Sequence, residues 1–385
     1  MKRLRTRAGL GERYPAQKNH PIAQELLPSG ALGRAYATVR RFGGAWRRKL
    51  SSRNAKRAPA WGDAGVLARS TPVFFVTGLG KSGTRWLTRI LDSHPEVLCR
   101  GEGRFFSADW MRADLDPANE TALPSSLYYA LTHSEHLRLW IERSVWSRDG
   151  DTDGQIDALM RLATEYFLTA ELSKTGKRLV GDKSPLLDEE FMREVSAVYP
   201  GARVIHIIRD GRDRTVSSMH RGWRRASQGY LHRLSPEEVA RGKAVREGQR
   251  EPAGAFTEEW LRQAARHWRL LVGRAVEDGP ALLGSDYTEV RYEDLLERPH
   301  QEVGRLLAFL GVDTQDKLVE HCVSSASFEQ LSGGRTQGEE DSSSFYRKGI
   351  AGDWKNHFTE EDKRVFKEEA GELLIRLGYE RDLDW

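Results

Sequence analysis

The stretch Val73-Phe74-Phe75-Val76-Thr77-Gly78-Leu79-Gly80-Lys81-Ser82-Gly83-Thr84-Arg85-Trp86-Leu87 decides the fold. Its first four residues form a short apolar run, which is typical of a strand buried on both faces of a parallel sheet. Glycine-rich sequence follows, and apolar residues then recur at helical spacing from Trp86 to Leu91 until Pro95 ends the helix. A strand, a glycine-rich loop and a helix in this order bind phosphate, because backbone N–H groups and the helix N-terminus converge on an anion.

The loop differs from the usual ATP or GTP loop at one position. The pattern G-x-x-x-x-G-K-[ST] requires glycine at position 75, which is Phe75 here. Lys81 can still neutralise a bound anion. A glycine turn with a surface lysine is the alternative interpretation of this motif alone.

A second apolar run, residues 204–208, predicts another buried strand, and helical spacing returns from Thr257 to Val276. Strands that alternate with helices predict an α/β fold of three layers, P-loop-like, with a central parallel sheet flanked by helices. We expect one domain over residues 71–385, with an exposed insertion near 224–256, where apolar residues are few.

The basic residues are concentrated at the N-terminus. Residues 1–60 contain fifteen Lys or Arg and two acids, a local net charge of +13, so the other residues carry −9 of the total of +4. This arm is predicted to be flexible or an amphipathic helix, either a solvated tail or a helix in peripheral contact with an anionic membrane. A transit peptide is a third interpretation. We do not expect nucleic acid to be a partner.

The remaining composition is that of a globular protein. The two cysteines, Cys99 and Cys322, lie far apart without metal-ligand spacing, so neither a disulfide framework nor a metal site is expected. No apolar stretch approaches the ~18 residues that span a bilayer, and no secretory signal follows Met1. We therefore predict a cytoplasmic protein.

The segment Lys81-Ser82-Gly83-Thr84-Arg85-Trp86-Leu87 resembles the loop K-S-G-T-T-W-L of sulfotransferases that use 3′-phosphoadenosine 5′-phosphosulfate (PAPS). In that family the loop holds the 5′-phosphosulfate. The resemblance implies that residues 81–86 bind PAPS. Arg85 replaces the second threonine of the motif, so one hydroxyl contact of the family is altered here.

Two further motifs resemble the segments that bind the 3′-phosphate in the same family. The first contains Arg209, at the end of a strand, and Ser217 eight residues later. The second, residues 345–359, matches the block R-K-G-x-x-G-D-W-K-x-x-F-T. The resemblance implies that Arg347, Lys348 and Gly349 close over the 3′-phosphate, and that residues 352–354 have a structural role.

Three aromatic residues are implied at the adenine ring. Ser327-Phe328 resembles the T-S-F segment of the family, so Trp86 and Phe328 are the expected stacking pair. Tyr292, in Tyr292-Glu293-Asp294, resembles the tyrosine of the family's Y-E-D segment and is expected near the adenine.

The resemblance implies transfer of a sulfuryl group from PAPS to an acceptor hydroxyl, with release of the desulfonated nucleotide PAP and without a metal requirement. The acceptor can be a carbohydrate, a lipid-linked molecule or a small molecule, since nothing in the variable segments specifies it. A P-loop nucleotide-dependent kinase, or a basic protein that binds membrane or nucleic acid, is the alternative. The oligomeric state is not predicted.

The expected catalytic residues are Lys81, Lys183 and Glu102. Cytosolic sulfotransferases carry a histidine base in K-[ST]-H-L-P, but Lys183-Ser184-Pro185-Leu186 lacks it. Residues 94–102 instead resemble H-P-E-V-x-C-G-E of tyrosylprotein sulfotransferases, with one residue inserted, which makes Glu102 the implied base. The alternatives are a pairing of Glu102 with Arg100 or Arg104, and a surface position for Lys183. His206, inside an apolar strand, is predicted to be a core residue.

Overall fold

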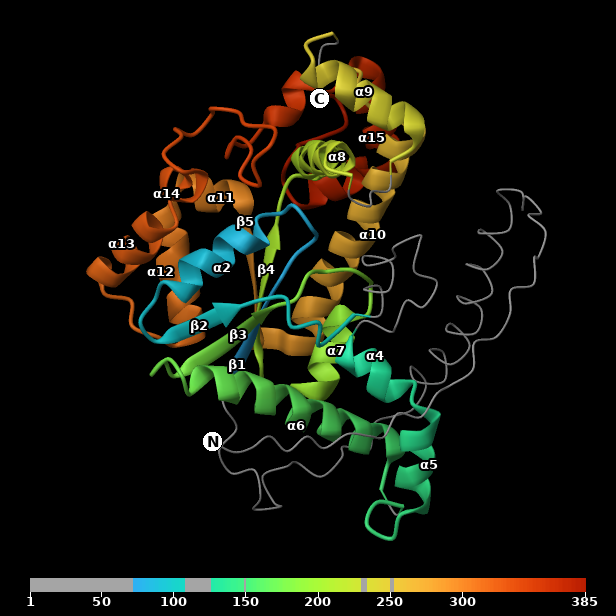
Figure 1. The fold of residues 1–385 in the computed structure, drawn as a ribbon, viewed down its shortest axis with the longest axis vertical. Coiled ribbons are helices and arrows are strands. Elements are labelled where there is room, and N and C mark those ends of the chain that lie inside the picture. The colour runs from blue at the N-terminus through green and yellow to red at the C-terminus, as the bar shows by residue number, and fades with distance from the viewer. Residues whose placement is uncertain (1–71, 108–125, 149, 230–233, 250–252) are drawn as a thin grey trace, which may run out of the picture. The chain divides into compact units, whose positions relative to one another are not determined.

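The computed structural model describes residues 72–107, 126–148, 150–229, 234–249 and 253–385 (Figure 1). The predicted basic arm, residues 1–60, lies outside these ranges. Its proposed helix and its membrane contact therefore stay predictions.

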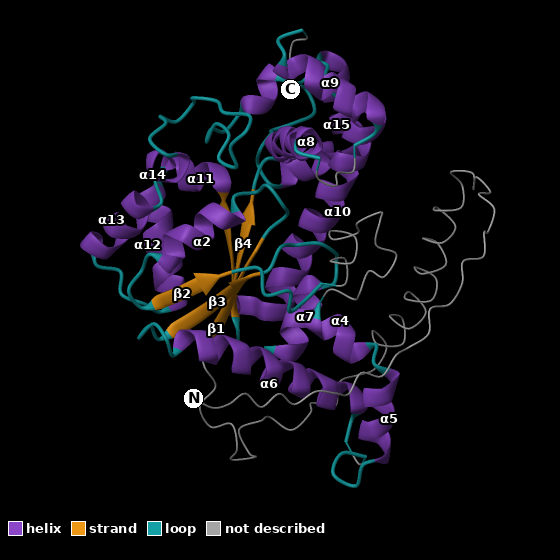
Figure 2. Cartoon of the chain, in the orientation of Figure 1, coloured by secondary structure: helices purple, strands orange, loops and turns teal. Residues whose placement is uncertain are grey.

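A sheet of five parallel strands forms the centre of the domain (Figure 2). The strands are β1 (Val73–Thr77), β2 (Val97–Arg100), β3 (Leu179–Lys183), β4 (Arg203–Ile208) and β5 (Tyr287–Arg291). Their order is β2-β3-β1-β4-β5, so β1 is the central strand. All five residues of β1 are buried, as expected for a strand covered on both faces. Both predicted strands are confirmed.

Helices cover both faces of the sheet, because the side chains of β1 alternate between two hydrophobic cores. Phe75 packs with apolar side chains of α6, α7, α8, α10 and α15 on one face. Phe74 and Val76 pack with α2, α12 and α13 on the other. The predicted three-layer α/β fold is therefore confirmed. The helices named here are α2 (Thr84–Asp92), α6 (Thr152–Leu172), α7 (Phe191–Val198), α8 (Gly211–Ser227), α10 (Glu258–Leu283), α12 (Pro299–Leu310), α13 (Asp316–Ser325) and α15 (Glu360–Arg376).

Shorter helices complete the domain. They are α4 (Leu127–Thr132), α5 (Glu135–Arg143), α9 (Pro236–Arg246), α11 (Tyr292–Glu297), α14 (Phe328–Ser332) and the 3₁₀ turns η2 (Gly284–Asp286) and η3 (Asp353–Asn356). No helix in the ranges given above is both long and apolar enough to cross a membrane.

The segment 224–256, predicted as an exposed insertion, is exposed only in part. Five of the eleven residues of α9 are exposed, and two, Glu238 and Gly242, are buried. However, the indole N–H of the buried Trp223 donates to the carbonyl of Glu238 at 3.0 Å, and Phe256 belongs to the core. The large apolar surface of Trp223 ties α9 to the domain, which the low apolar content of the segment did not indicate.

Candidate functional site

The carboxyl ends of the five parallel strands meet at one edge of the sheet, and most predicted site residues directly follow them. β1 leads into the glycine-rich loop, β3 ends at Lys183, and Arg209 follows β4. Glu102 comes two residues after β2, and Tyr292 follows β5. Ligands of open α/β sheets bind outside this edge. The topology thus gathers residues from five distant segments.

The glycine-rich loop has its backbone in the left-handed region at Lys81 (φ +80) and Gly83 (φ +98). A Cβ at position 83 would lie 2.6 Å from the ring of Tyr292, so this turn requires glycine. Ser82 is buried, and its Oγ has no hydrogen-bond partner within the described ranges. A buried hydroxyl without a partner in such a turn fits a site that binds an anion.

The first turn of α2 contains the next three predicted residues. Thr84 is buried, Arg85 is exposed and Trp86 is half-buried. The indole N–H of Trp86 donates to the carbonyl of Ala326 at 2.9 Å, and its ring packs edge-to-face on Tyr292 with centroids 5.5 Å apart.

The second predicted stacking residue, Phe328, lies two residues beyond Ala326. Its ring lies so close to Gly349 (φ +69) that a Cβ there would be 2.3 Å away. Trp86, in the first predicted phosphate loop, is hydrogen-bonded to Ala326, two residues before Phe328. Phe328 in turn packs beside Gly349 of the C-terminal phosphate loop.

Lys81 lies in a concentration of positive charge. Burial lowers the pKa of Lys81 from 10.5 to about 7, and four arginines act in the same direction. They are Arg221, Arg224, Arg209 and Arg347. Ser217 lines the same small cavity as Lys81 and Arg347. Cations that repel one another in a partly dry cavity favour the binding of an anion.

Arg209 connects the two predicted phosphate loops. Its guanidinium group donates to the carbonyl of Lys81 at 3.3 Å and to the carbonyl of Ile350 at 3.1 Å. It lies over the ring of Tyr292, 4.2 Å from the centroid. Its buried Nε has no partner among the described residues. Tyr292 was expected near the adenine ring, and in the structure its ring lies against Gly83 of the glycine-rich loop and under Arg209.

The C-terminal motif is held by two buried carboxylates. Arg347 and Lys348 both form ion pairs with Asp353, the second at 2.7 Å. Burial alone would raise the pKa of Asp353, but these cations hold it below its ordinary value. Asp213 accepts hydrogen bonds from the backbone N–H of Gly352 at 2.6 Å and of Trp354 at 2.8 Å. These contacts are consistent with the structural role expected for residues 352–354.

The predicted base and the predicted second cation are partners. Lys183 forms an ion pair with Glu102, and their side chains are 10% and 40% exposed. The neighbouring Asp182 accepts a hydrogen bond from the N–H of Gly103 at 2.9 Å, which fixes the loop after β2 to the end of β3. Burial raises the pKa of Asp182 to about 6. Because its side chain is only 10% exposed, Lys183 is not a surface residue.

Comparison with known proteins identifies the family of this chain. The chain matches the family model described as "Sulfotransferase family" over residues 72–316, which is more than half of its length. The chain belongs to the sulfotransferase family.

The curated relatives of this chain include proteins with two kinds of name. Protein-tyrosine sulfotransferase 2 of Gallus gallus is 20% identical over 262 residues, which cover 66% of this chain and 55% of that protein. Sulfotransferase 1B1 of Canis lupus familiaris is 35% identical over 97 residues, which cover 22% of this chain and 33% of that protein. The chain thus spans between about a third and about half of the length of these relatives.

Among solved structures, mouse sulfotransferase SULT7A1 complexed with PAP aligns with a TM-score of 0.43 and 17% sequence identity. The alignment covers 78% of this chain and 85% of that chain.

Several residues beside the predicted site were not predicted as site residues. Arg214 donates to the carbonyl of Gly80 at 3.1 Å. The Nε2 atoms of His220 and His357 lie 3.0 Å apart beside the C-terminal motif. Only Asp213 left a signal in the sequence, because it stands four residues after Arg209, in the first turn of the helix that follows the predicted strand.

The structure also bears on two predictions outside the phosphate loops, those for His206 and for the partner of Glu102. His206 is fully buried and its Nδ1 lies 2.8 Å from the hydroxyl of Tyr287, so the predicted core position is confirmed. Arg100 pairs with Glu171 at 3.0 Å, so the alternative pairing of Glu102 with Arg100 is wrong, whereas its pairing with Arg104 stays a prediction. Glu171 lies on α6, whose position beside β2 the sequence did not reveal.

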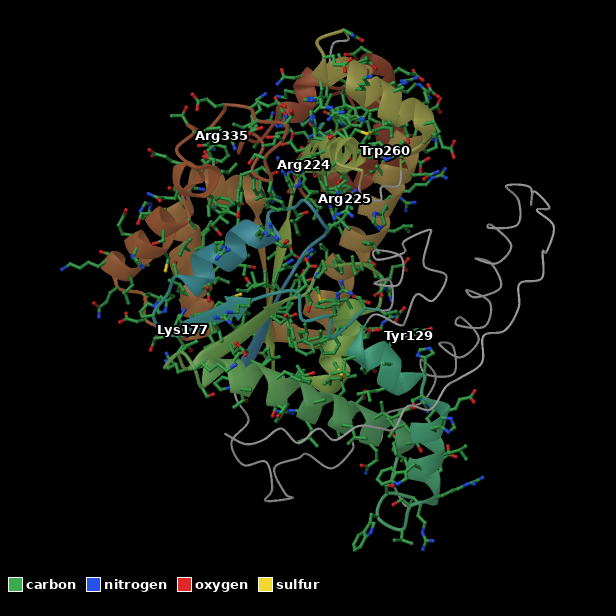
Figure 3. All side chains as sticks on the ribbon, viewed as in Figure 1. Tyr129, Lys177, Arg224, Arg225, Trp260 and Arg335 are labelled. Atoms are coloured by element: carbon green, nitrogen blue, oxygen red, sulfur yellow. The ribbon has the colours of Figure 1, made fainter. Side chains whose placement is uncertain are left out.

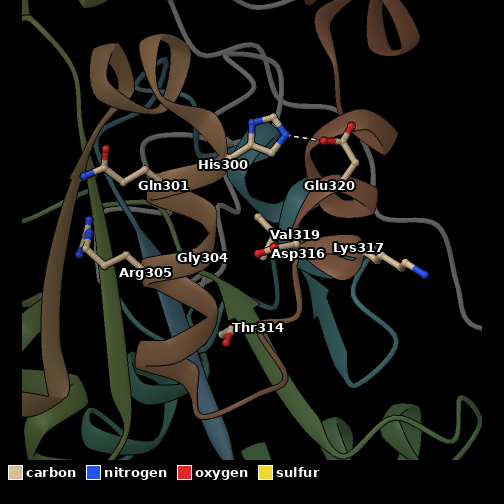
Figure 4. Close-up of a pocket in the computed structure, with 9 residues that line it drawn as sticks. All are labelled: His300, Gln301, Gly304, Arg305, Thr314, Asp316, Lys317, Val319 and Glu320. Atoms are coloured by element: carbon tan, nitrogen blue, oxygen red, sulfur yellow. Dashed lines mark hydrogen bonds and ion pairs between the residues drawn. The ribbon is translucent and has the colours of Figure 1, made fainter.

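A hollow of about 590 Å³ lies between α12 and α13 (Figure 4). The ring of His300 and the carboxylate of Glu320 meet across it at 2.5 Å. None of the predicted site residues lines this hollow, so it is separate from the candidate site. Its lining consists of His300, Gln301, Gly304, Arg305, Thr314, Asp316, Lys317, Val319 and Glu320.

Proposed function

We propose that this protein transfers the sulfuryl group of PAPS to an acceptor hydroxyl and releases PAP. The observation that carries the proposal is the position of Arg209, whose guanidinium group touches both the glycine-rich loop at Lys81 and the C-terminal motif at Ile350. Two anion-binding loops that share one arginine suit a nucleotide with phosphate groups at two ends. Membership of the sulfotransferase family supports the same conclusion.

The residues present fit such a nucleotide. Ser82 Oγ and Arg209 Nε are buried donors without a protein partner among the described residues, and a bound phosphate would satisfy them. We assign residues 81–84 to the 5′-phosphosulfate. We assign Arg209, Ser217 and the 347–349 loop to the 3′-phosphate. Trp86 and Phe328 are assigned to the adenine ring.

The chemistry requires a base and a cation on opposite sides of the transferred group. The acceptor oxygen forms a bond to sulfur, while the bond between sulfur and the 5′-phosphate oxygen breaks. Glu102 accepts the proton that leaves the acceptor hydroxyl. Lys81 stabilises the negative charge that develops on the 5′-phosphate.

Lys183 has two tasks in this proposal. Its ion pair with Glu102 holds the carboxylate at the carboxyl edge of β2 and β3. Its ammonium group also adds positive charge where the bridging oxygen of the donor becomes anionic. Because its side chain is only 10% exposed, this charge is poorly screened by water.

The experiment that tests the proposal follows the label of ³⁵S-PAPS into a panel of phenols, sugars and lipid-linked sugars. We expect PAP and a labelled sulfate ester to form in equal amounts in the presence of EDTA. A protein that leaves PAPS intact with every acceptor, yet transfers phosphate from ATP with magnesium, would be a kinase instead.

The same proposal includes two further points: the N-terminal arm is not needed for catalysis, and the protein is cytoplasmic. Deleting residues 1–60 is expected to spare sulfuryl transfer. If the protein instead acted only by binding through the basic arm, the deletion would abolish that binding. A cytoplasmic location agrees with Cys99 and Cys322, which are both free and buried.

A further inference from the structure

Helix α8 carries cations beyond the turn that we assign to the 3′-phosphate. Ser217 and Arg224 are seven residues apart, so they lie on the same face of the helix, about 10 Å apart along its axis. Both line the cavity that contains Lys81. Arg224 is therefore two turns beyond the serine that we assign to the nucleotide.

A second cation, Arg85, contacts Phe345, which lines the same cavity. Arg85 occupies the position where the sulfotransferase loop motif has its second threonine, and its side chain is exposed. Its guanidinium carbon lies 4.3 Å from the centre of the Phe345 ring, and Lys81 Nζ lies 4.4 Å from the same centre. Phe345 thus has two cations against one aromatic ring.

Arg224, labelled in Figure 3, extends from α8 and contacts the loop that contains Phe345. Its Nη1 donates to the carbonyl of Ser344, the residue before Phe345, at 2.5 Å. Burial lowers the pKa of Arg224, and Arg225 and Arg85 lower it further, so Arg85 and Arg224 lie within electrostatic reach of each other. Asp341 acts in the opposite direction.

The ion pairs of the site separate its cations into two groups. Arg347 and Lys348 pair with Asp353, and Arg209 lies 3.8 Å from Asp213. By contrast, neither Arg85 nor Arg224 has a carboxylate within 4.0 Å in the ranges that the structure describes. Adjacent cations without carboxylates repel each other, and an anion between them would relieve this repulsion.

We infer that Arg85 and Arg224 form a subsite for an acidic group of the acceptor, so that the preferred substrate is a hydroxyl compound that also carries a carboxylate or a similar anion. This inference rests on the proposed function and narrows its substrate class. The subsite lies beside Phe345, the ring that both Lys81 and Arg85 contact. An acceptor bound there by its acidic group presents a hydroxyl to the sulfuryl group.

The test uses the full chain saturated with PAP and two pairs of probes that differ in one acidic group. The pairs are 4-hydroxyphenylacetate with 4-hydroxyphenylacetamide, and methyl glucuronoside with methyl glucoside. Isothermal titration calorimetry measures the binding of each probe, and ³⁵S-PAPS measures its turnover. PAP binding is measured first, because its absence contradicts the proposed function and the inference with it.

We expect at least one acid to bind at least tenfold more tightly than its neutral partner. In Arg224→Gln and in Arg85→Thr, which restores the residue of the family motif, this preference should fall below twofold. Arg269→Gln removes the same charge from an exposed position on α10 and should keep the preference. With PAP bound normally, the inference is overturned if the neutral probes bind as tightly as the acids, if neither acid binds, or if the preference survives both substitutions.

Discussion

Lys183, the last residue of β3, forms an ion pair with Glu102, two residues beyond the end of β2. The pair exists because β2 and β3 are adjacent in the sheet, with Arg100 opposite Asp182. It places a carboxylate beside a cation at the edge where the glycine-rich loop begins. This relationship leads to the first prediction.

Glu102→Gln should lower kcat at least a hundredfold, because general bases typically contribute 10²- to 10⁴-fold to the rate. PAP affinity should change less than threefold, since the amide keeps the size of the side chain. Glu171→Gln is the matched control, because the Glu171 carboxylate, 45% exposed, also forms an ion pair, with Arg100. Normal turnover in Glu102→Gln would eliminate Glu102 as the base.

The depressed pKa of Lys81 predicts a pH dependence of PAP binding. With its pKa at about 7, Lys81 of the free protein is protonated below pH 7 and loses its charge as the pH rises. PAP affinity should therefore fall between pH 7.5 and 9.5, approaching tenfold per pH unit. Arg at this position stays charged, so Lys81→Arg should flatten the profile. Equal slopes in the two proteins would assign the titration to another group.

The lowered pKa of Lys81 also affects the stability of the free protein, which should rise with pH where the PAP affinity falls. Lys81 has a lower pKa in the folded protein than in the unfolded chain, so the unfolded chain binds more protons between pH 7 and 10.5. The contribution of Lys81 to the free energy of unfolding should therefore rise with pH across this window. Lys81→Met should lack this contribution, which urea unfolding at several pH values in the absence of PAP would detect.

Asp213 should position Arg347 and Lys348 indirectly, through the backbone of residues 352–354. Its carboxylate accepts the N–H groups of Gly352 and Trp354, and hydrogen bonds to charged groups contribute about 1.5–3 kcal/mol each. Asp213→Asn retains one acceptor oxygen, so we expect a loss of about 2 kcal/mol in the free energy of unfolding and at least tenfold weaker PAP binding. Urea unfolding and calorimetry measure the two effects. An unchanged PAP affinity would show that this anchor does not position Arg347 and Lys348.

Gly349 and Gly352 provide a matched pair of substitutions. Both have positive φ, +69 and +79, so alanine strains the backbone at either position by about 1–2 kcal/mol. Only at position 349 does a Cβ meet the ring of Phe328, because position 352 faces open space. Gly349→Ala should therefore weaken PAP binding at least tenfold more than Gly352→Ala. Similar affinities in the two variants would argue against Phe328 as an adenine-stacking residue.

The sequence identified the features that depend on neighbouring residues. The apolar run from Val73 and the glycines that follow it predicted β1, the loop and α2, because burial and backbone freedom act within a few residues. The same holds for β4 and for Arg209 at its end. Resemblance to a known family then supplied the order of the phosphate motifs.

The contacts that depend on sheet order could not be predicted in the same way. Nothing near Glu102 in the sequence indicates Lys183, which is 81 residues away. The contact between Asp213 and Trp354 joins residues 141 positions apart, and His220 meets His357 across 137. Each requires the order of the strands or the path of the C-terminal loop to be known.

The most direct test of the PAPS-binding site is a calorimetric titration in EDTA with PAP, with adenosine 5′-phosphate as the matched control that lacks the 3′-phosphate. Arg209, Ser217 and Arg347 predict metal-free PAP binding at least a hundredfold tighter than that of the control. Equal binding of the two nucleotides, or tight binding only of ATP with magnesium, would contradict a site built for the 3′-phosphate and with it the role of PAPS as the donor.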